Sequence, residues 1–125
     1  MKRIPVAEDQ EDLRAILRDY LTASGYTVIE AVDGVESVAK AASERPDLVL
    51  MDIQPPVLDG YEATRQIKAL HGLATIPIIA VSSFAMKGDE EKARASGCDD
   101  YVTKPYSPVD LLRLMRRYLG ENAPR

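Results

Sequence analysis

The chain contains very little cysteine: Cys98 is the only one among its 125 residues. A single cysteine excludes an intramolecular disulfide framework and a cysteine-based zinc site. Such scarcity is typical of proteins that work in a reducing compartment. We therefore expect a core that forms without covalent crosslinks, which a chain of this length is large enough to bury.

The chain also lacks long apolar runs and an excess of basic residues. No run approaches the roughly 20 apolar residues that span a membrane, and Glu8 and Asp9 appear before a signal peptide could form. The net charge of -4 argues against a nucleic-acid surface, which needs a basic stripe. We expect a cytoplasmic protein without a membrane or nucleic-acid partner.

What the sequence does contain is a regular alternation of short apolar strands and amphipathic helices. The predicted strands lie within residues 4–7, 26–31, 47–52, 76–81 and 98–103, and the predicted helices within about 13–24, 34–45, 60–71, 86–96 and 108–119. This order predicts right-handed crossovers and a five-stranded parallel sheet with helices on both faces. We expect one α/β domain over residues 1–125, with a frayed tail at 120–125.

Helical spacing also predicts which side chains face the core. In the second helix these are Val35, Val38, Ala39 and Ala42, and in the last helix Leu111, Leu112, Met115, Tyr118 and Leu119. The helix at about 86–96 is the most polar, so it should bury the least surface and be the most mobile.

Polar side chains follow four of the predicted strands. Glu8 and Asp9 come after the first strand, Asp52 ends the third, Ser82 follows the fourth and Lys104 follows the fifth. Each alone has an ordinary explanation, since an acid at a strand end is commonly a helix N-cap and a lysine there is commonly solvated. In a parallel sheet, however, all these ends meet at one edge, where ligands bind.

These residue types together favour phosphoryl chemistry. Three neighbouring carboxylates repel one another and favour a hard divalent cation, Mg²⁺ or Mn²⁺ rather than zinc. A carboxylate beside such a cation can attack phosphorus and form an acyl phosphate. Lys104 and Ser82 could bind the other phosphoryl oxygens. The sequence therefore predicts a site that accepts a phosphoryl group.

Three segments resemble the receiver domain of two-component response regulators: VAEDQEDLR, DLVLMDIQPPVLDGYEAT and IPIIAVSSFAMKGDEEKARASGCDDYVTKP. The resemblance covers nearly the whole chain and is to a chemotaxis-receiver-like, stand-alone response regulator. It implies a flavodoxin-like (βα)5 fold with strand order 2-1-3-4-5. It also implies a signalling protein that catalyses only its own phosphorylation and dephosphorylation, not a conventional enzyme.

The resemblance assigns roles to the residues at the strand ends. It implies that Asp52 is the phosphoacceptor and also a metal ligand, and that Asp9 is the direct Mg²⁺ ligand of the acidic pair. Glu8 would act on the metal through water, and the backbone carbonyl of Gln54 would be a further ligand. Lys104 would contact the phosphoryl group, which would come from a histidine kinase or a histidine phosphotransfer protein.

The resemblance also implies a switch. Ser82 occupies the hydroxyl switch position and Tyr101 the aromatic one, so phosphorylation would change a partner-binding surface. That surface comprises the helix at 86–96, the strand at 98–103 and the last helix. The expected state is a monomer or a phosphorylation-dependent dimer.

Three residues depart from the family pattern, and one peptide bond is expected to follow it. Pro5 stands inside an internal strand, so either that strand starts late or the sheet is locally irregular. Pro55 restricts Gln54 to extended conformations and stiffens the loop after Asp52. Phe84 and Gln54 would tune the rate of dephosphorylation. The apolar ring of Phe84 predicts that this dephosphorylation is slow. The resemblance further implies a cis peptide bond at Lys104–Pro105.

Other functions are weighed against the receiver hypothesis. A haloacid-dehalogenase-type phosphohydrolase needs a second Asp two residues after its nucleophile, where this chain has Gln54. A flavodoxin needs a phosphate-binding loop after the first strand, where Glu8 to Asp12 would repel phosphate. A purely structural domain leaves the acid cluster unexplained. A receiver cut from a hybrid histidine kinase stays open as the alternative to a stand-alone regulator.

Overall fold

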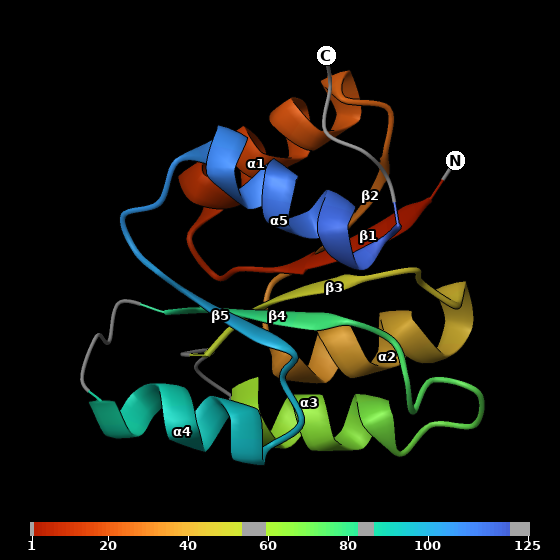
Figure 1. Cartoon of the computed structure of the whole chain (residues 1–125). Coiled ribbons are helices and arrows are strands. Elements are labelled where there is room, and N and C mark those ends of the chain that lie inside the picture. The colour runs from red at the N-terminus through yellow and green to blue at the C-terminus, as the bar shows by residue number, and fades with distance from the viewer. Residues whose placement is uncertain (1, 54–59, 83–86, 121–125) are drawn as a thin grey trace.

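The computed structural model describes residues 2–53, 60–82 and 87–120, without the side chains of 87–89. Strands and helices alternate along these ranges, as Figure 1 shows. The strands are β1 (Arg3–Ala7), β2 (Thr27–Ala31), β3 (Val49–Asp52), β4 (Ile78–Ser82) and β5 (Asp100–Thr103). The helices are α1 (Glu11–Ala23), α2 (Gly34–Glu44), α3 (Gly60–Lys68), α4 (Lys87–Ala95) and α5 (Pro108–Tyr118).

All five strands are parallel and form one sheet in the order β2-β1-β3-β4-β5. Helices α1 and α5 cover one face of the sheet, and α2, α3 and α4 cover the other (Figure 1). This arrangement confirms the expected α/β fold and strand order. No helix in the described part of the chain is long and apolar enough to cross a bilayer.

The central strand β3 is buried on both faces. Leu50 packs into the cluster beneath α1 and α5, whereas Val49 and Met51 pack into the cluster beneath α2 and α3. All three are at most 1% exposed, and each such buried side chain stabilises the fold by roughly 1.5–3 kcal/mol. The dense packing on both sides fixes the position of Asp52 at the end of the strand.

Local capping explains where several helices begin and end. The Asp33 carboxylate accepts a hydrogen bond from the Glu36 backbone over 2.9 Å and caps α2. Ser107 caps α5, whose first residue is Pro108. Gly25 follows α1 with a φ of 98°, a left-handed conformation that favours glycine.

Pro5 lies inside β1, so the strand does not start late. Residues on both sides of Pro5 pair with β2 throughout, but the pairing of β1 with β3 involves only Val6 and Ala7. Before Pro5, Arg3 holds the β3 side of the strand. Its backbone N–H donates to the Asp47 carboxylate, and its carbonyl accepts from the Asp47 backbone N–H. The proline, which lacks an N–H, thus falls in a gap of the β1–β3 ladder.

Two predicted core faces were partly wrong. In α2 the buried side chains are Ser37 and Ala41, while Val35 is 50% exposed and Ala39 and Ala42 are exposed as well. Small side chains on the inner face let the helix approach the sheet closely. This close packing determines the buried face, and the periodicity of apolar residues does not.

The second error concerns α5. Tyr118 is 37% exposed, because its hydroxyl reaches Asp99 and Asp100 at the start of β5 instead of the core. Leu111, Leu112 and Met115 are buried as predicted.

Candidate functional site

The sheet brings the polar strand ends together. Glu8 and Asp9 directly follow β1, Asp52 ends β3 and Ser82 ends β4, and these three strands are neighbours in the sheet. Lys104 follows β5 at the edge, and its backbone N–H donates to the Ser82 carbonyl over 2.7 Å. The residues predicted from the strand ends therefore share one edge of the sheet.

Three carboxylates form the centre of this edge. One oxygen each of Glu8, Asp9 and Asp52 lies within 4.8 Å of the others. Glu8 and Asp52 are buried, at 3% and 4% exposed, whereas Asp9 is exposed. Buried charges of one sign are costly unless a cation compensates them.

Lys104 supplies part of that compensation. Its ammonium group lies 2.9 Å from a carboxylate oxygen of Glu8 and 3.3 Å from one of Asp52. The Glu8 backbone is fixed as well, since its N–H donates to Ala31 and its carbonyl accepts a 2.8 Å bond from Arg14. These contacts hold the acid cluster in a defined arrangement.

The environment changes the acidity of these groups. Burial raises the pKa of Glu8 to about 7, and the nearby Asp52 adds to the rise, while Lys104 opposes it. Burial works against the charge of Lys104, but the carboxylates of Glu8 and Asp52 outweigh this effect and raise the pKa of the ammonium group. Near neutral pH, Lys104 is therefore charged while Glu8 is partly protonated.

The donor set suits a hard divalent cation. Among the described residues, the cluster offers carboxylate oxygens from three residues and no histidine or cysteine ligand, and one of the acids faces solvent. Mg²⁺ prefers oxygen ligands and keeps several waters, which an open acid such as Asp9 permits. On this chemistry, the residues present fit Mg²⁺ or Mn²⁺.

The two predicted switch residues lie on neighbouring strands. Ser82 is fully buried at the end of β4. Tyr101 is half-buried on β5 and packs against the core cluster beneath α2 and α3. The remaining predicted site residues, Gln54 and Phe84, lie outside the described residues, as does Pro55. The Lys104–Pro105 peptide bond is cis, as expected.

Sequence reasoning missed Gly60, the first residue of α3. A Cβ atom at this position would lie 2.6 Å from the Ile53 Cα and 2.7 Å from the Asp52 carbonyl oxygen. The glycine lets α3 begin directly against the end of β3. A glycine at the start of the helix predicted within residues 60–71 could have indicated this close backbone approach.

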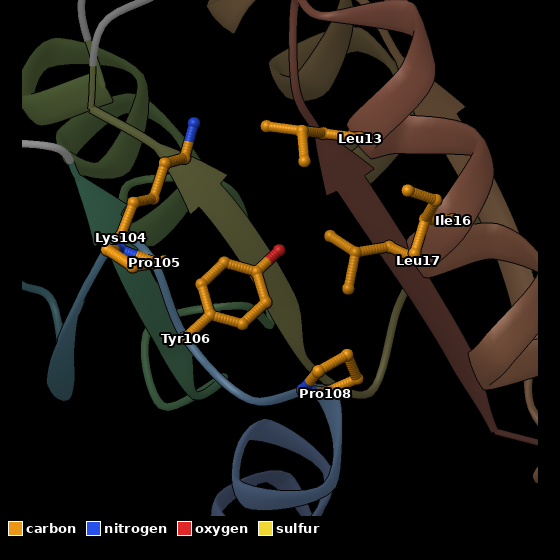
Figure 2. Close-up of a pocket in the computed structure, with 7 residues that line it drawn as sticks. All are labelled: Leu13, Ile16, Leu17, Lys104, Pro105, Tyr106 and Pro108. Atoms are coloured by element: carbon orange, nitrogen blue, oxygen red, sulfur yellow. The ribbon is translucent and has the colours of Figure 1, made fainter.

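Sequence reasoning also missed an apolar groove, which is lined in part by Lys104 (Figure 2). It has a volume of about 460 Å³ and runs between α1 and the segment after β5. Its lining residues are Leu13, Ile16, Leu17, Lys104, Pro105, Tyr106 and Pro108. Ile16 is 55% exposed, so this surface presents apolar side chains next to Lys104.

Tyr106 connects the groove to the cluster electrostatically. Burial raises the pKa of its hydroxyl to about 12, and the charges of Glu8 and Asp52 add to the rise. The phenol is therefore neutral at physiological pH and can donate a hydrogen bond.

Comparison with known proteins gives a consistent result. The family described as response regulator receiver domain matches residues 4–116. The polar-differentiation response regulator DivK of Brucella anthropi is 43% identical, and the match covers 96% of this chain and 98% of that protein.

Solved structures agree with the sequence match. The receiver domain of the sensor histidine kinase PA1611 from Pseudomonas aeruginosa, which has a magnesium ion in its active-site cleft, is 37% identical. It superposes with a TM-score of 0.89 over 96% of this chain and 98% of that one. Chemotaxis protein CheY4 of Vibrio cholerae is 26% identical, with a TM-score of 0.90 over 94% and 98% of the chains.

Proposed function

Because the chain belongs to the response regulator receiver domain family, we propose that Asp52 is the residue that accepts the phosphoryl group. Receiver domains are phosphoacceptor signalling proteins of two-component systems, and they are not conventional enzymes. The observation that carries the assignment is the position of Asp52. It is buried at the end of β3, within 4.8 Å of two further carboxylates and 3.3 Å from the Lys104 ammonium group.

Asp9 and Asp52 would hold Mg²⁺ directly, and Glu8 would act through water. Gln54, which lies outside the described residues, would contribute its carbonyl. Mn²⁺ could replace Mg²⁺ in a site of oxygen ligands. When bound, the cation neutralises charge on the phosphoryl oxygens and on the acid cluster.

The residues of the chain then perform the transfer. A carboxylate oxygen of Asp52 attacks phosphorus, an O–P bond forms, and the N–P bond to the donor imidazole breaks. The electron pair of that bond remains on the departing imidazole nitrogen. Lys104 contacts one phosphoryl oxygen as a point charge, and the Ser82 hydroxyl contacts another.

The phosphodonor is a histidine on a histidine kinase or a histidine phosphotransfer protein. The groove between α1 and the segment after β5 supports a protein donor, because it offers apolar side chains directly beside Lys104 (Figure 2). Ile16 is the most exposed large apolar residue of the groove lining. A small-molecule donor would not need this surface.

The output of the reaction is a change of surface. Ser82 would move toward the bound phosphoryl group, and Tyr101 would turn further inward. The surface formed by α4, β5 and α5 would then bind a downstream protein, or a second copy of the chain.

We also infer that residues 1–125 are one receiver domain that works as a stand-alone regulator. The match to DivK supports this organisation, because it covers 98% of that protein. The second candidate is a receiver from a hybrid histidine kinase, which the similarity to the PA1611 receiver favours. Detection of the chain's native length in cell extracts with an antibody distinguishes the two.

Intact-mass measurement after incubation with acetyl phosphate and Mg²⁺ tests the function. The wild-type chain should gain one phosphoryl group, and Asp52→Asn should gain none. Asp19→Asn, which removes an exposed acid of α1, should behave like wild type. Absence of an adduct on the wild type, or an adduct on Asp52→Asn, would overturn the proposal.

A further inference from the structure

The described side chains of helix α4 make few apolar contacts with the rest of the molecule. Among its described side chains, residues 90–95, only Ala93 is buried. The Lys92 ammonium group lies 5.6 Å from the centre of the Tyr61 ring, and such exposed cation–π contacts are weak. Among residues 90–95, little apolar surface holds α4, so polar bonds contribute to its position.

Those bonds converge on the start of β5. One guanidinium nitrogen of Arg94, in the last turn of α4, donates to the Asp99 carbonyl over 3.2 Å. A second lies 3.6 Å from the Asp100 carboxylate. From the end of α5, the Tyr118 hydroxyl lies 2.9 Å from the Asp99 carbonyl and 2.9 Å from the Asp100 carboxylate. The ends of α4 and α5 thus meet on the same two residues.

Asp99 gives this group of bonds a fixed point. Its carboxylate accepts a 2.9 Å bond from Lys68 on α3 and a 2.8 Å bond from the Ile78 backbone at the start of β4. Lys68 also donates to the Ile76 carbonyl. The start of β5 is therefore tied to α3 and β4, whereas the bonds of Arg94 and Tyr118 link it to α4 and α5.

Asp100 links the same bonds to Tyr101. Its carboxylate accepts a 2.8 Å hydrogen bond from the Tyr101 backbone N–H, in addition to the contacts with Arg94 and Tyr118. A displacement of α4, or a rearrangement of the backbone at Tyr101, must therefore lengthen at least one of these contacts.

We propose that Arg94, Asp100 and Tyr118 form a clamp that holds α4 and α5 in the resting arrangement and opens when Asp52 carries a phosphoryl group. The inference rests on the proposed function, in which phosphorylation changes the surface of α4, β5 and α5. Bonds present in only one of two states bias the equilibrium toward that state. By linkage, a weaker clamp must strengthen phosphoryl binding at the distant acid cluster.

Tyr118→Phe tests the clamp, because it removes only the hydroxyl. Two quantities are measured: hydrogen exchange of the amides at the start of β5 and in the last turn of α5 in the resting protein, and the dissociation constant for beryllofluoride, a phosphoryl analogue, with Mg²⁺. We expect faster exchange at these amides, where the hydroxyl bonds, and about fivefold tighter beryllofluoride binding, the effect of losing one net hydrogen bond. Asp110→Asn is the matched control, since it breaks an exposed ion pair within α5.

The outcomes separate the clamp from the proposed function. Faster exchange with unchanged or weaker beryllofluoride binding would make the contacts merely structural and overturn the clamp. Unchanged exchange would overturn it as well. If wild-type protein binds no beryllofluoride and takes up no phosphoryl group, the proposed function fails, and with it the coupling that the clamp requires.

Discussion

The Lys104 ammonium group lies closer to Glu8, at 2.9 Å, than to Asp52, at 3.3 Å. The lysine that the phosphoryl group would need is thus engaged with a neighbouring acid in the resting site. A phosphoryl group on Asp52 offers Lys104 new anionic oxygens, so we expect Lys104 to exchange Glu8 for phosphate. Glu8 then becomes available to the metal's water shell.

Replacing Lys104 should expose this double role. In Lys104→Met, Glu8 and Asp52 lose their cation, and the free energy of unfolding without Mg²⁺ should fall by about 1–3 kcal/mol at alkaline pH. The same loss of positive charge should tighten Mg²⁺ binding, which calorimetric titration measures. Lys104→Arg keeps the charge and should change both quantities less. Unchanged stability together with weaker Mg²⁺ binding would contradict the prediction.

Stability without metal should depend on pH through Glu8. Its pKa is about 7 in the folded chain and 4.5 ordinarily, so the folded state binds more protons between these values. The stabilisation is therefore complete below the ordinary pKa and is lost as the pH rises through 7. Urea denaturation from about pH 5 to pH 8 should show this decline, and Glu8→Gln should flatten it. An equal slope in Glu8→Gln, with Glu11→Gln as the exposed control, would exclude Glu8 as the cause.

Gly60 should be needed for both stability and phosphorylation. In Gly60→Ala the new Cβ would collide with the backbone of Asp52 and Ile53, which should cost about 1–3 kcal/mol and slow phosphorylation. Gly25→Ala is the comparison, since it introduces strain at a φ of 98° but meets no atom within 4 Å. It should lose about 1–2 kcal/mol and keep the wild-type phosphorylation rate. Chemical denaturation and acetyl phosphate kinetics measure the two effects, and equal phosphorylation rates would contradict the role of Gly60.

Replacing Ile16 should affect phosphorylation by protein donors but not phosphorylation by small-molecule donors. Ile16→Asp places a charge in the groove, so transfer from a phosphorylated histidine phosphotransfer domain should slow by roughly tenfold or more. Phosphorylation by acetyl phosphate should not change. Val32→Asp alters an exposed apolar residue outside the groove and serves as the control. Equal slowing with both donors would show that Ile16 acts on the acid site and not on docking.

Much of this architecture is predictable from local patterns. The apolar run before Asp52 indicates a strand buried on both faces, and parallel strand ends must meet at one edge, so the convergence of Glu8, Asp52 and Lys104 follows from topology. The helix faces were harder to predict. Ser37 is fully buried in α2 while Val35 is half exposed, because close approach of the helix favoured small side chains over apolar ones.

Contacts between segments distant in sequence were not predictable in this way. Lys104 pairs with Glu8 as well as with Asp52. This pairing depends on small differences in side-chain position, which the spacing of residues in the sequence does not predict. Likewise, Tyr118 was expected in the core from helical periodicity, yet its hydroxyl bonds at the start of β5. Apolar periodicity predicts which side chains are buried. It does not predict the position of a tyrosine whose hydroxyl, and not its ring, determines where the side chain lies.

The most direct test of the central claim locates the phosphoryl group within the chain. After phosphorylation with acetyl phosphate and Mg²⁺, borohydride reduces an aspartyl phosphate to homoserine, which peptide mass spectrometry identifies by position. We predict homoserine at position 52 alone, and none when Mg²⁺ is chelated. Homoserine at position 9 or at another acid, with unmodified Asp52, would contradict the account.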